Sequence, residues 1–197
     1  MKKIVCCLFI FSCLIVENLF AATTTQCFYK NPSYTKYINE IEDSAKEISK
    51  NSDQASKQHT LNIAAIFAAH IIQMHPEYLQ QALNHYKTFS SDEKAIFCRS
   101  LFISGQENYL RDNMMDASLR KNVYSPNQIS LSTFHDFQVK QPGDIDLLWA
   151  SFFATGNTIY IHKIIEVLNE DEEALIVGYE FVNRQFLNRI KSGSFGY

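Results

Sequence analysis

Apolar residues recur at helical spacing along most of the chain. Between residues 34 and 48 they fall three or four positions apart, and polar or charged residues fill most of the positions between them. This spacing places apolar side chains on one side of a helix with 3.6 residues per turn. The segment therefore predicts an amphipathic α-helix, which the polar run Asn51-Ser52-Asp53 ends.

Further helices are predicted from their start signals. Several residues are suited to open a helix, either as caps or as members of the first turn. Thr60 is suited to cap an alanine-rich helix with one apolar face through Ile72, and Pro76 to begin a helix over residues 76–87. Ser90 with Glu93 is suited to open a helix through Ile103, and Asp144 to cap residues 145–154. Asn169 precedes four acidic residues, which are favourable at the positive end of a helix, and this predicts a last helix from there to Ile190.

Residues 118–142 break the helical pattern. They are polar, contain two prolines, and alternate apolar with polar positions only from Ile129 to Thr133. The pattern predicts a long loop with one short extended piece. Long loops in compact domains often carry function, although a mobile insertion is the simpler interpretation. His135 and Asp136 in this loop are the only adjacent pair suited to acid–base chemistry.

A repeat is the most informative feature of the sequence. Three segments that begin at Ala68, Arg99 and Ala150 align without gaps, each with apolar residues, a turn, and then a tyrosine followed by an aliphatic residue. Gly105 and Gly156 occupy the turn in the second and third copies, and glycine there favours the left-handed end of a helix. Each copy therefore predicts a helical hairpin of about 30 residues, which needs neighbours to bury its apolar face.

These patterns predict an all-α fold of stacked antiparallel helical hairpins, as a short α-solenoid or an orthogonal bundle, with one long irregular insertion at about 118–142. The period and the paired helices resemble tetratricopeptide-type hairpins, although that family's Trp, Leu-Gly, Tyr, Ala and Pro pattern is not reproduced. Separately, residues 144–156, DIDLLWASFFATG, resemble a segment of poorly characterised exported bacterial all-helical proteins. That resemblance covers about the last 60 residues and implies no activity.

The first 21 residues have the layout of a secretory signal peptide. Two lysines precede an apolar run from Ile4 to Val16, and cleavage is expected after Ala21. Cys13 makes a lipoprotein the alternative. The expected organisation is an arm at 22–33, one helical domain at 34–190 and a tail at 191–197. The sequence thus predicts export to the periplasm or the medium, and its composition suits a Gram-negative bacterium.

Composition then excludes several classes of protein. The net charge is −3, and loss of two lysines and one glutamate with the signal makes it −4, which excludes a generally basic nucleic-acid binder. Gly and Pro together are too few for a many-stranded β-sandwich. No segment of the mature chain is long and apolar enough to predict a membrane span. The pattern predicts no oligomeric state.

Two cysteines remain after the predicted cleavage. Cys27 and Cys98 form an even pair in an exported chain, which suggests one disulfide between them. The alternative is that Cys98, within a strongly apolar helix, is simply a small buried residue. The sequence leaves both interpretations open.

Candidate chemistry is sparse, which favours binding over catalysis. The motifs of phosphate loops, dinucleotide folds, serine hydrolases and zinc proteases are missing, and no cofactor or metal site is predicted. Tyr109 and Tyr160 occupy matching repeat positions and, with Trp149 and Phe153, are candidates for a concave binding face. The prediction is an exported module that binds a protein or peptide. The alternative is a small secreted enzyme, such as a hydrolase, with its site in the 118–142 loop.

Overall fold

The computed structural model of the protein describes residues 27–110, 119–120, 123 and 129–170. These residues are mostly helical, and none of them forms a strand, so the predicted all-α fold is confirmed. The α-helices are α2 (Tyr34–Lys50), α3 (Gln54–Met74), α4 (Pro76–His85), α5 (Ser91–Ile103), α7 (Pro142–Thr155) and α8 (Ile159–Glu170). Four short 3₁₀ helices accompany them within the described ranges: η1 (Phe28–Lys30), η2 (Tyr86–Thr88), η3 (Glu107–Tyr109) and η4 (Leu131–Asp136).

Cys27–Ile161 form one compact unit, and the described residues beyond it belong to a second. The predicted signal peptide at 1–21, most of the predicted arm at 22–33 and the tail at 191–197 lie outside the described residues. So does the predicted last helix beyond residue 170. Asn169 does not open that helix, because it lies within the last turn of α8.

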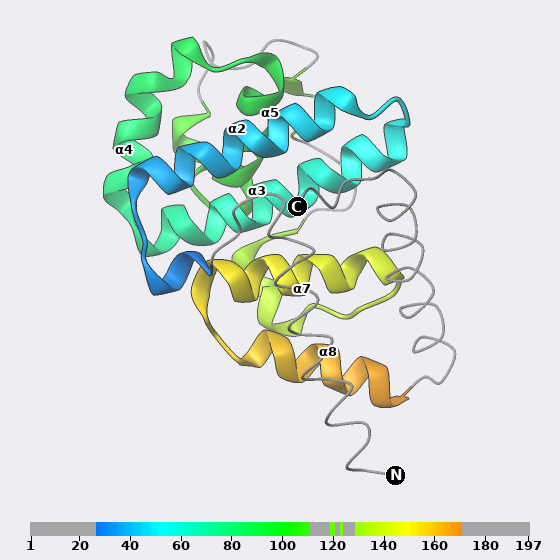
Figure 1. The fold of residues 1–197 in the computed structure, drawn as a ribbon. Coiled ribbons are helices and arrows are strands. Elements are labelled where there is room, and N and C mark those ends of the chain that lie inside the picture. Colours follow the sequence, from blue (N-terminus) through cyan, green and yellow to red (C-terminus); the bar gives the residue numbers. More distant parts are fainter. Residues whose placement is uncertain (1–26, 111–118, 121–122, 124–128, 171–197) are drawn as a thin grey trace, which may run out of the picture. The chain divides into compact units, whose positions relative to one another are not determined.

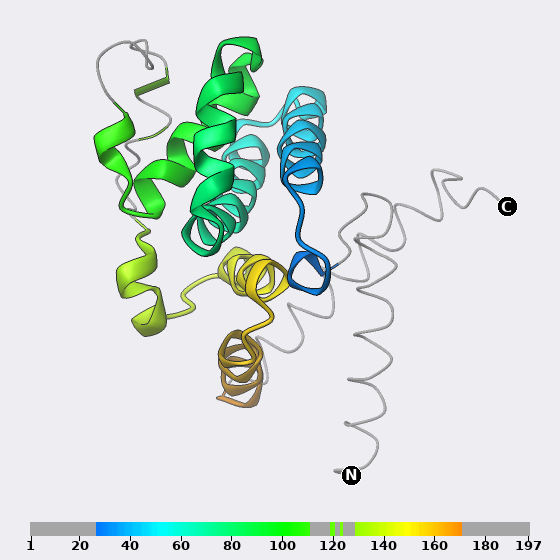
Figure 2. The same ribbon diagram turned by 90° about the vertical axis from the view of Figure 1, so that its left-hand side faces the viewer.

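Helix α3 is the centre of the first unit. It packs against α2, α5 and α7, and Figures 1 and 2 show it running between α2 and α7. Its buried side chains surround the helix: Leu61, Ala64, Ala65, Ile66, Phe67, Ala68, Ala69, His70, Ile71 and Ile72. The predicted single apolar face is therefore wrong for α3, because three neighbouring helices cover it. The alanines let those helices approach closely.

The start of α3 also differs from the prediction. The Asp53 carboxylate caps the helix, accepting a hydrogen bond from the Ser56 backbone N–H at 2.7 Å. Thr60 lies in the second turn, where its hydroxyl donates to the Ser56 carbonyl at 3.0 Å. Capping by Thr60 was inferred because apolar periodicity begins at Leu61, but the first turns of α3 are polar and still helical.

Contacts among the helices favour a bundle. In a solenoid each repeat contacts only its neighbours. Here α3, from the first predicted repeat, packs against α5 of the second and α7 of the third. Of the two architectures that the sequence left open, a bundle fits these contacts better than a solenoid.

Local start signals are confirmed for two helices and corrected for a third. Pro76 occupies the first turn of α4, and Ser90 with Glu93 forms the capping box of α5. Helix α7, however, begins at Pro142, earlier than predicted. The Asp144 carboxylate lies inside its first turn and accepts hydrogen bonds from the backbone N–H groups of Lys140 and Gln141, at 2.8 and 3.2 Å.

Both turn glycines have the predicted left-handed backbone. Gly105 has φ +74° and Gly156 has φ +69°. After α5 the Gln106 N–H donates to the Leu101 carbonyl at 2.8 Å and the Gly105 N–H donates to the Phe102 carbonyl at 3.1 Å, which is a Schellman motif. The following elements differ between copies, since α8 follows Gly156 whereas the short helix η3 follows Gly105.

The predicted insertion is more helical than expected. Leu131 to Asp136 form the 3₁₀ helix η4, so the predicted extended piece is wrong. Leu119, Arg120 and Val123 also have helical backbone. The buried Arg99 of α5 donates a hydrogen bond from Nη1 to the Val123 carbonyl at 3.2 Å, which ties this segment to the bundle.

The cysteines are not joined. Cys27 and Cys98 are both free thiols in the structure, so the disulfide that the sequence suggested is absent. Cys98 is fully buried on α5, and its Sγ lies 3.4 Å from the Tyr86 hydroxyl. Burial raises the pKa of its thiol to about 11. This matches the alternative interpretation of Cys98 as a small buried residue.

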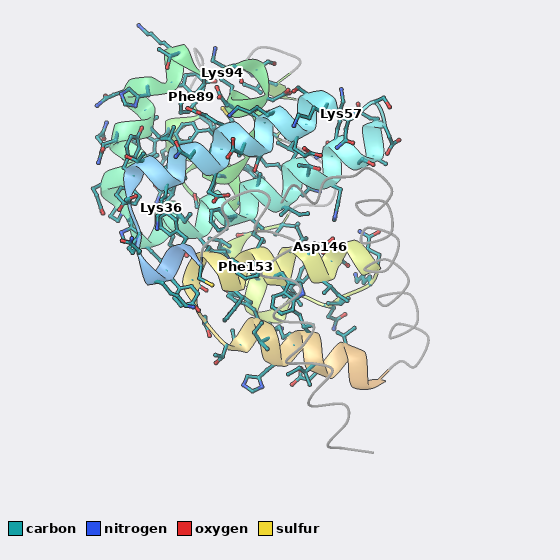
Figure 3. The ribbon with its side chains drawn as sticks, viewed as in Figure 1. Lys36, Lys57, Phe89, Lys94, Asp146 and Phe153 are labelled. Atoms are coloured by element: carbon teal, nitrogen blue, oxygen red, sulfur yellow. The ribbon has the colours of Figure 1, made fainter. Side chains whose placement is uncertain are left out.

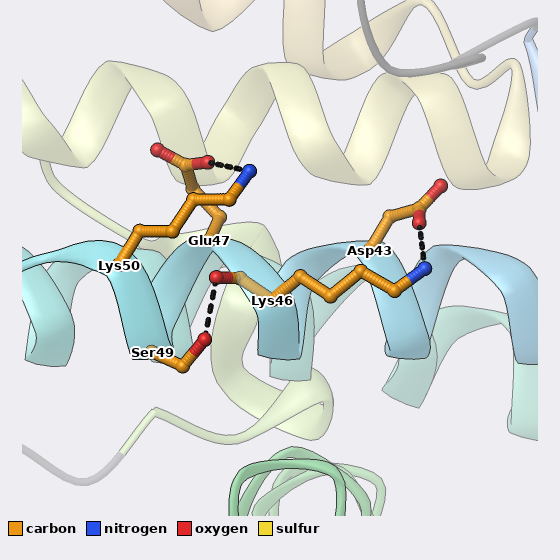
Figure 4. A network of polar contacts seen from close by, with 5 residues as sticks. All are labelled: Asp43, Lys46, Glu47, Ser49 and Lys50. Atoms are coloured by element: carbon orange, nitrogen blue, oxygen red, sulfur yellow. Dashed lines mark hydrogen bonds and ion pairs between the residues drawn. The ribbon is translucent and has the colours of Figure 1, made fainter.

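The predicted N-terminal arm contributes to the core. Phe28 of η1 is 1% exposed and packs edge-on against Phe67, His75 and Tyr78, with ring centroids 6.0 to 6.5 Å apart. Helix η1 also contacts α7. The exposed face of α2, in contrast, carries surface ion pairs such as Lys46 with Asp43 at 2.9 Å (Figure 4). Such pairs contribute little to stability.

Candidate functional site

Helix α7 presents a cluster of aromatic rings. The Trp149 ring stacks on Phe153 with centroids 5.7 Å apart, and Phe152 meets both rings at 6.2 and 5.7 Å. Phe153, labelled in Figure 3, is buried, whereas Trp149 and Phe152 are partly exposed. Spacings of three and four residues put Trp149, Phe152 and Phe153 on adjacent parts of the helix surface. The buried ring therefore supports two accessible ones.

Tyr29 of η1 extends this cluster. Its ring lies 5.8 Å from that of Phe152, and it also covers Gly156 at the end of α7. A Cβ atom at Gly156 would lie 2.6 Å from the Tyr29 ring, so only glycine leaves room for this contact. We call the partly exposed residues Tyr29, Trp149 and Phe152 the α7 aromatic surface.

The structure brings together two of the four predicted binding residues. Trp149 and Phe153 are in contact, but Tyr160 lies in another cluster with His70 and Phe134. Tyr109 is 41% exposed on η3 and has no ring partner among the described residues. The common face predicted from the repeat is therefore not formed by all four residues.

Two members of the α7 aromatic surface are not among the four predicted binding residues. Phe152 adjoins Phe153 in the sequence, and its spacing of three residues from Trp149 was a usable signal. Tyr29 gave no such signal, because its contact with Phe152 spans more than a hundred residues of chain.

His70 is one of the buried titratable groups of the bundle. It is 5% exposed on α3, and its Nε2 atom has no hydrogen-bond partner among the described residues. Its ring meets those of Phe134 and Tyr160 edge to face, with centroids 6.1 and 5.6 Å away. Burial lowers the pKa of His70 to about 4, so the imidazole is neutral at physiological pH.

Acid is expected to destabilise the protein through His70. Its pKa is about 6.5 when unfolded and about 4 when folded, so between these values the unfolded chain binds a proton that the native state does not. The free energy of unfolding therefore falls as the pH falls through this window, by about 2 to 3 kcal/mol from pH 7 to pH 4.5. Chemical denaturation at several pH values measures the effect.

The matched variant is His70→Leu, which keeps the volume and removes the titration. Glu40 acts in the opposite sense, because burial and the nearby Asp43 raise its pKa to about 7. Protonation of Glu40 therefore raises the free energy of unfolding as the pH falls. Since Glu40 is present in both proteins, the difference between wild type and His70→Leu isolates His70. If the free energy of unfolding changed with pH in the same way in both proteins, His70 would not be the group responsible for the loss of stability in acid.

A polar contact joins α3 to α7. The His59 Nε2 atom lies 2.9 Å from an Asp146 carboxylate oxygen, and Figure 3 marks Asp146 on α7. The His59 ring also lies against Gly143, where a Cβ would come within 2.9 Å of it. The sequence did not suggest this pair, since 87 residues separate its members. It links the second turn of α3 to the first half of α7.

The loop chosen for the alternative enzyme offers one described carboxylate. Asp136 is exposed on η4, and the side chain of His135 lies outside what the structure describes. Within the described ranges, no three His, Cys, Asp or Glu side chains are arranged to hold a metal ion. Of the helices that the structure describes, none has the length and apolar character needed to cross a bilayer.

Comparison with known proteins adds no assignment: no protein-family model matches the chain, and neither curated proteins nor solved structures show a significant match.

Proposed function

We propose that the protein is an exported binding module that holds a protein or peptide segment on the α7 aromatic surface. The observation that carries this proposal is the pair of partly exposed rings of Trp149 and Phe152, both of which pack against the buried ring of Phe153. Tryptophan, tyrosine and phenylalanine are enriched at protein interfaces and supply much of their binding energy. Rings held in place by their neighbours also lose little entropy on binding.

The chemistry of the partner follows from the lack of charge. From Leu147 to Gly156 the sequence contains no charged residue. The favoured ligand is therefore a peptide segment with apolar or aromatic side chains, rather than an acidic or basic one. Export to the periplasm or the medium is part of this proposal and is supported by the signal-peptide pattern at residues 1–21.

The test uses the chain from residue 22, the form expected after export. Peptides are selected from a random display library, and their affinity is followed by the emission of Trp149, the one tryptophan in the sequence. We expect selected peptides to be apolar, to shift the Trp149 emission, and to bind at least about tenfold more weakly to Phe152→Ala.

Tyr109→Ala is the matched control, because Tyr109 is another exposed aromatic residue. This variant is expected to bind the selected peptides as the wild type does. Equal affinity of wild type and Phe152→Ala would overturn the proposal, as would weakening by Tyr109→Ala alone. Turnover of generic ester or peptide substrates, without any peptide binding, would favour the enzyme instead.

A further inference from the structure

His70 occupies a position where it is energetically unfavourable, because it is 5% exposed and its Nε2 atom has no hydrogen-bond partner among the described residues. A buried polar atom without a hydrogen-bond partner destabilises a protein, and nearly all buried polar groups avoid this state. The residues before and after His70 on α3 are apolar and buried, so leucine would suit the position better. A residue that lowers stability in this way often serves function.

The His70 ring packs in a cluster with two other aromatic rings. We define the aromatic slot as the position that the Phe134 ring takes against His70 of α3 and Tyr160 of α8, whose own rings contact each other with centroids 5.6 Å apart. The Phe134 ring occupies it, 6.1 Å from His70 and 5.9 Å from Tyr160, and is 2% exposed. The slot shares no residue with the α7 aromatic surface.

The segment that supplies Phe134 is suited to move. It is the 3₁₀ helix η4, whose hydrogen-bond geometry is weaker than that of an α-helix. Among the η4 side chains that the structure describes, only Phe134 is buried. Phe137 stacks on Phe134 at 4.7 Å and is partly exposed, as is Tyr160, so only these two rings separate Phe134 from partly exposed surface.

We propose that His70 and Tyr160 form a binding site for a phenol ring, and that Phe134 occupies this site when no ligand is bound. A phenol ring has the size of the Phe134 ring and adds one hydroxyl. That hydroxyl can both donate and accept a hydrogen bond, so it satisfies Nε2 of His70 in either tautomer. The depressed pKa of His70 keeps the imidazole neutral, which favours an uncharged ligand over a carboxylate.

Calorimetric titration with p-cresol and toluene tests the proposal on the chain from residue 22. Removal of the internal competitor in Phe134→Ala is expected to tighten p-cresol binding by at least about tenfold over wild type. In that variant p-cresol is expected to bind about tenfold more tightly than toluene, because only p-cresol bonds to Nε2. Adding His70→Leu is expected to abolish this preference.

Two sources of the phenol ring are distinguished by a second ligand. Binding of N-acetyltyrosinamide together with p-cresol would assign the slot to a tyrosine side chain, and binding of p-cresol alone would assign it to a free phenol. Both results support the slot. Unchanged p-cresol affinity in Phe134→Ala overturns it, and so does a p-cresol preference that survives His70→Leu.

A measurement on the wild type makes the proposal independent of how Phe134→Ala folds. The ring protons of His70 are assigned in the NMR spectrum by comparison with His70→Leu. Saturating p-cresol is expected to shift the His70 signals while those of the exposed His85 stay in place. Unshifted His70 signals under these conditions overturn the proposal.

Discussion

Replacing Gly156 by alanine is expected to destabilise the bundle by about 3 kcal/mol or more. The left-handed backbone, φ +69°, accounts for about 1 to 2 kcal/mol of this for any residue with a Cβ. The remainder comes from the contact with Tyr29, whose ring the new Cβ would approach within 2.6 Å. Overlap of this kind displaces well-packed neighbours. Denaturation followed by far-ultraviolet circular dichroism measures the loss.

Gly105 provides a matched control in the same chain. It has nearly the same backbone conformation, φ +74°, but a Cβ there would meet no atom within 4 Å. Gly105→Ala is therefore expected to show the backbone effect alone, about 1 to 2 kcal/mol. In a Tyr29→Ala background, the loss of stability caused by Gly156→Ala is expected to fall to the same value. Equal effects of Gly156→Ala with and without Tyr29 would show that the ring yields without cost.

Replacing Phe28 by alanine is expected to lower the free energy of unfolding by about 3 to 5 kcal/mol. Phe28 is 1% exposed and contacts rings from α3 and α4, so its removal leaves a cavity between elements that are far apart in the sequence. The loss is a large part of the stability of a typical domain. The midpoint of guanidinium denaturation measures it.

Lys30→Ala is the control for Phe28→Ala. Lys30 belongs to the same 3₁₀ helix but is exposed, so its replacement is expected to change stability by about 0.5 kcal/mol or less. A loss below about 1 kcal/mol for Phe28→Ala would show that η1 unfolds separately from the bundle.

Helix starts and ends were predictable where a short stretch of chain decides them. The capping box of Ser90 and Glu93 joins residues three positions apart, and Pro76 acts within its own turn. The left-handed glycines act through their own backbone dihedrals. The start of α3 was not predictable in this way, because its first turns carry no periodic apolar residues. No helical spacing follows Asp53 closely enough to identify it as the cap.

The candidate sites were predictable only in part. Trp149 and Phe153 lie four residues apart on one predicted helix, and in the structure their rings stack on each other. Tyr160 was placed with them by the repeat, but its ring meets His70 and Phe134, from segments far away along the chain. No local pattern specifies a contact across such separations.

The sequence by itself determined the helical content, the turn glycines and most helix boundaries, because periodicity, capping and backbone preference act within a few residues. The tertiary structure decided which surfaces are covered. It buries α3 on all sides from Leu61 to Ile72, brings Phe28 of the predicted arm into the core, leaves the two cysteines unbonded, and places Phe134 against His70. These outcomes depend on which helices meet, and that is set by the packing of side chains from the whole unit.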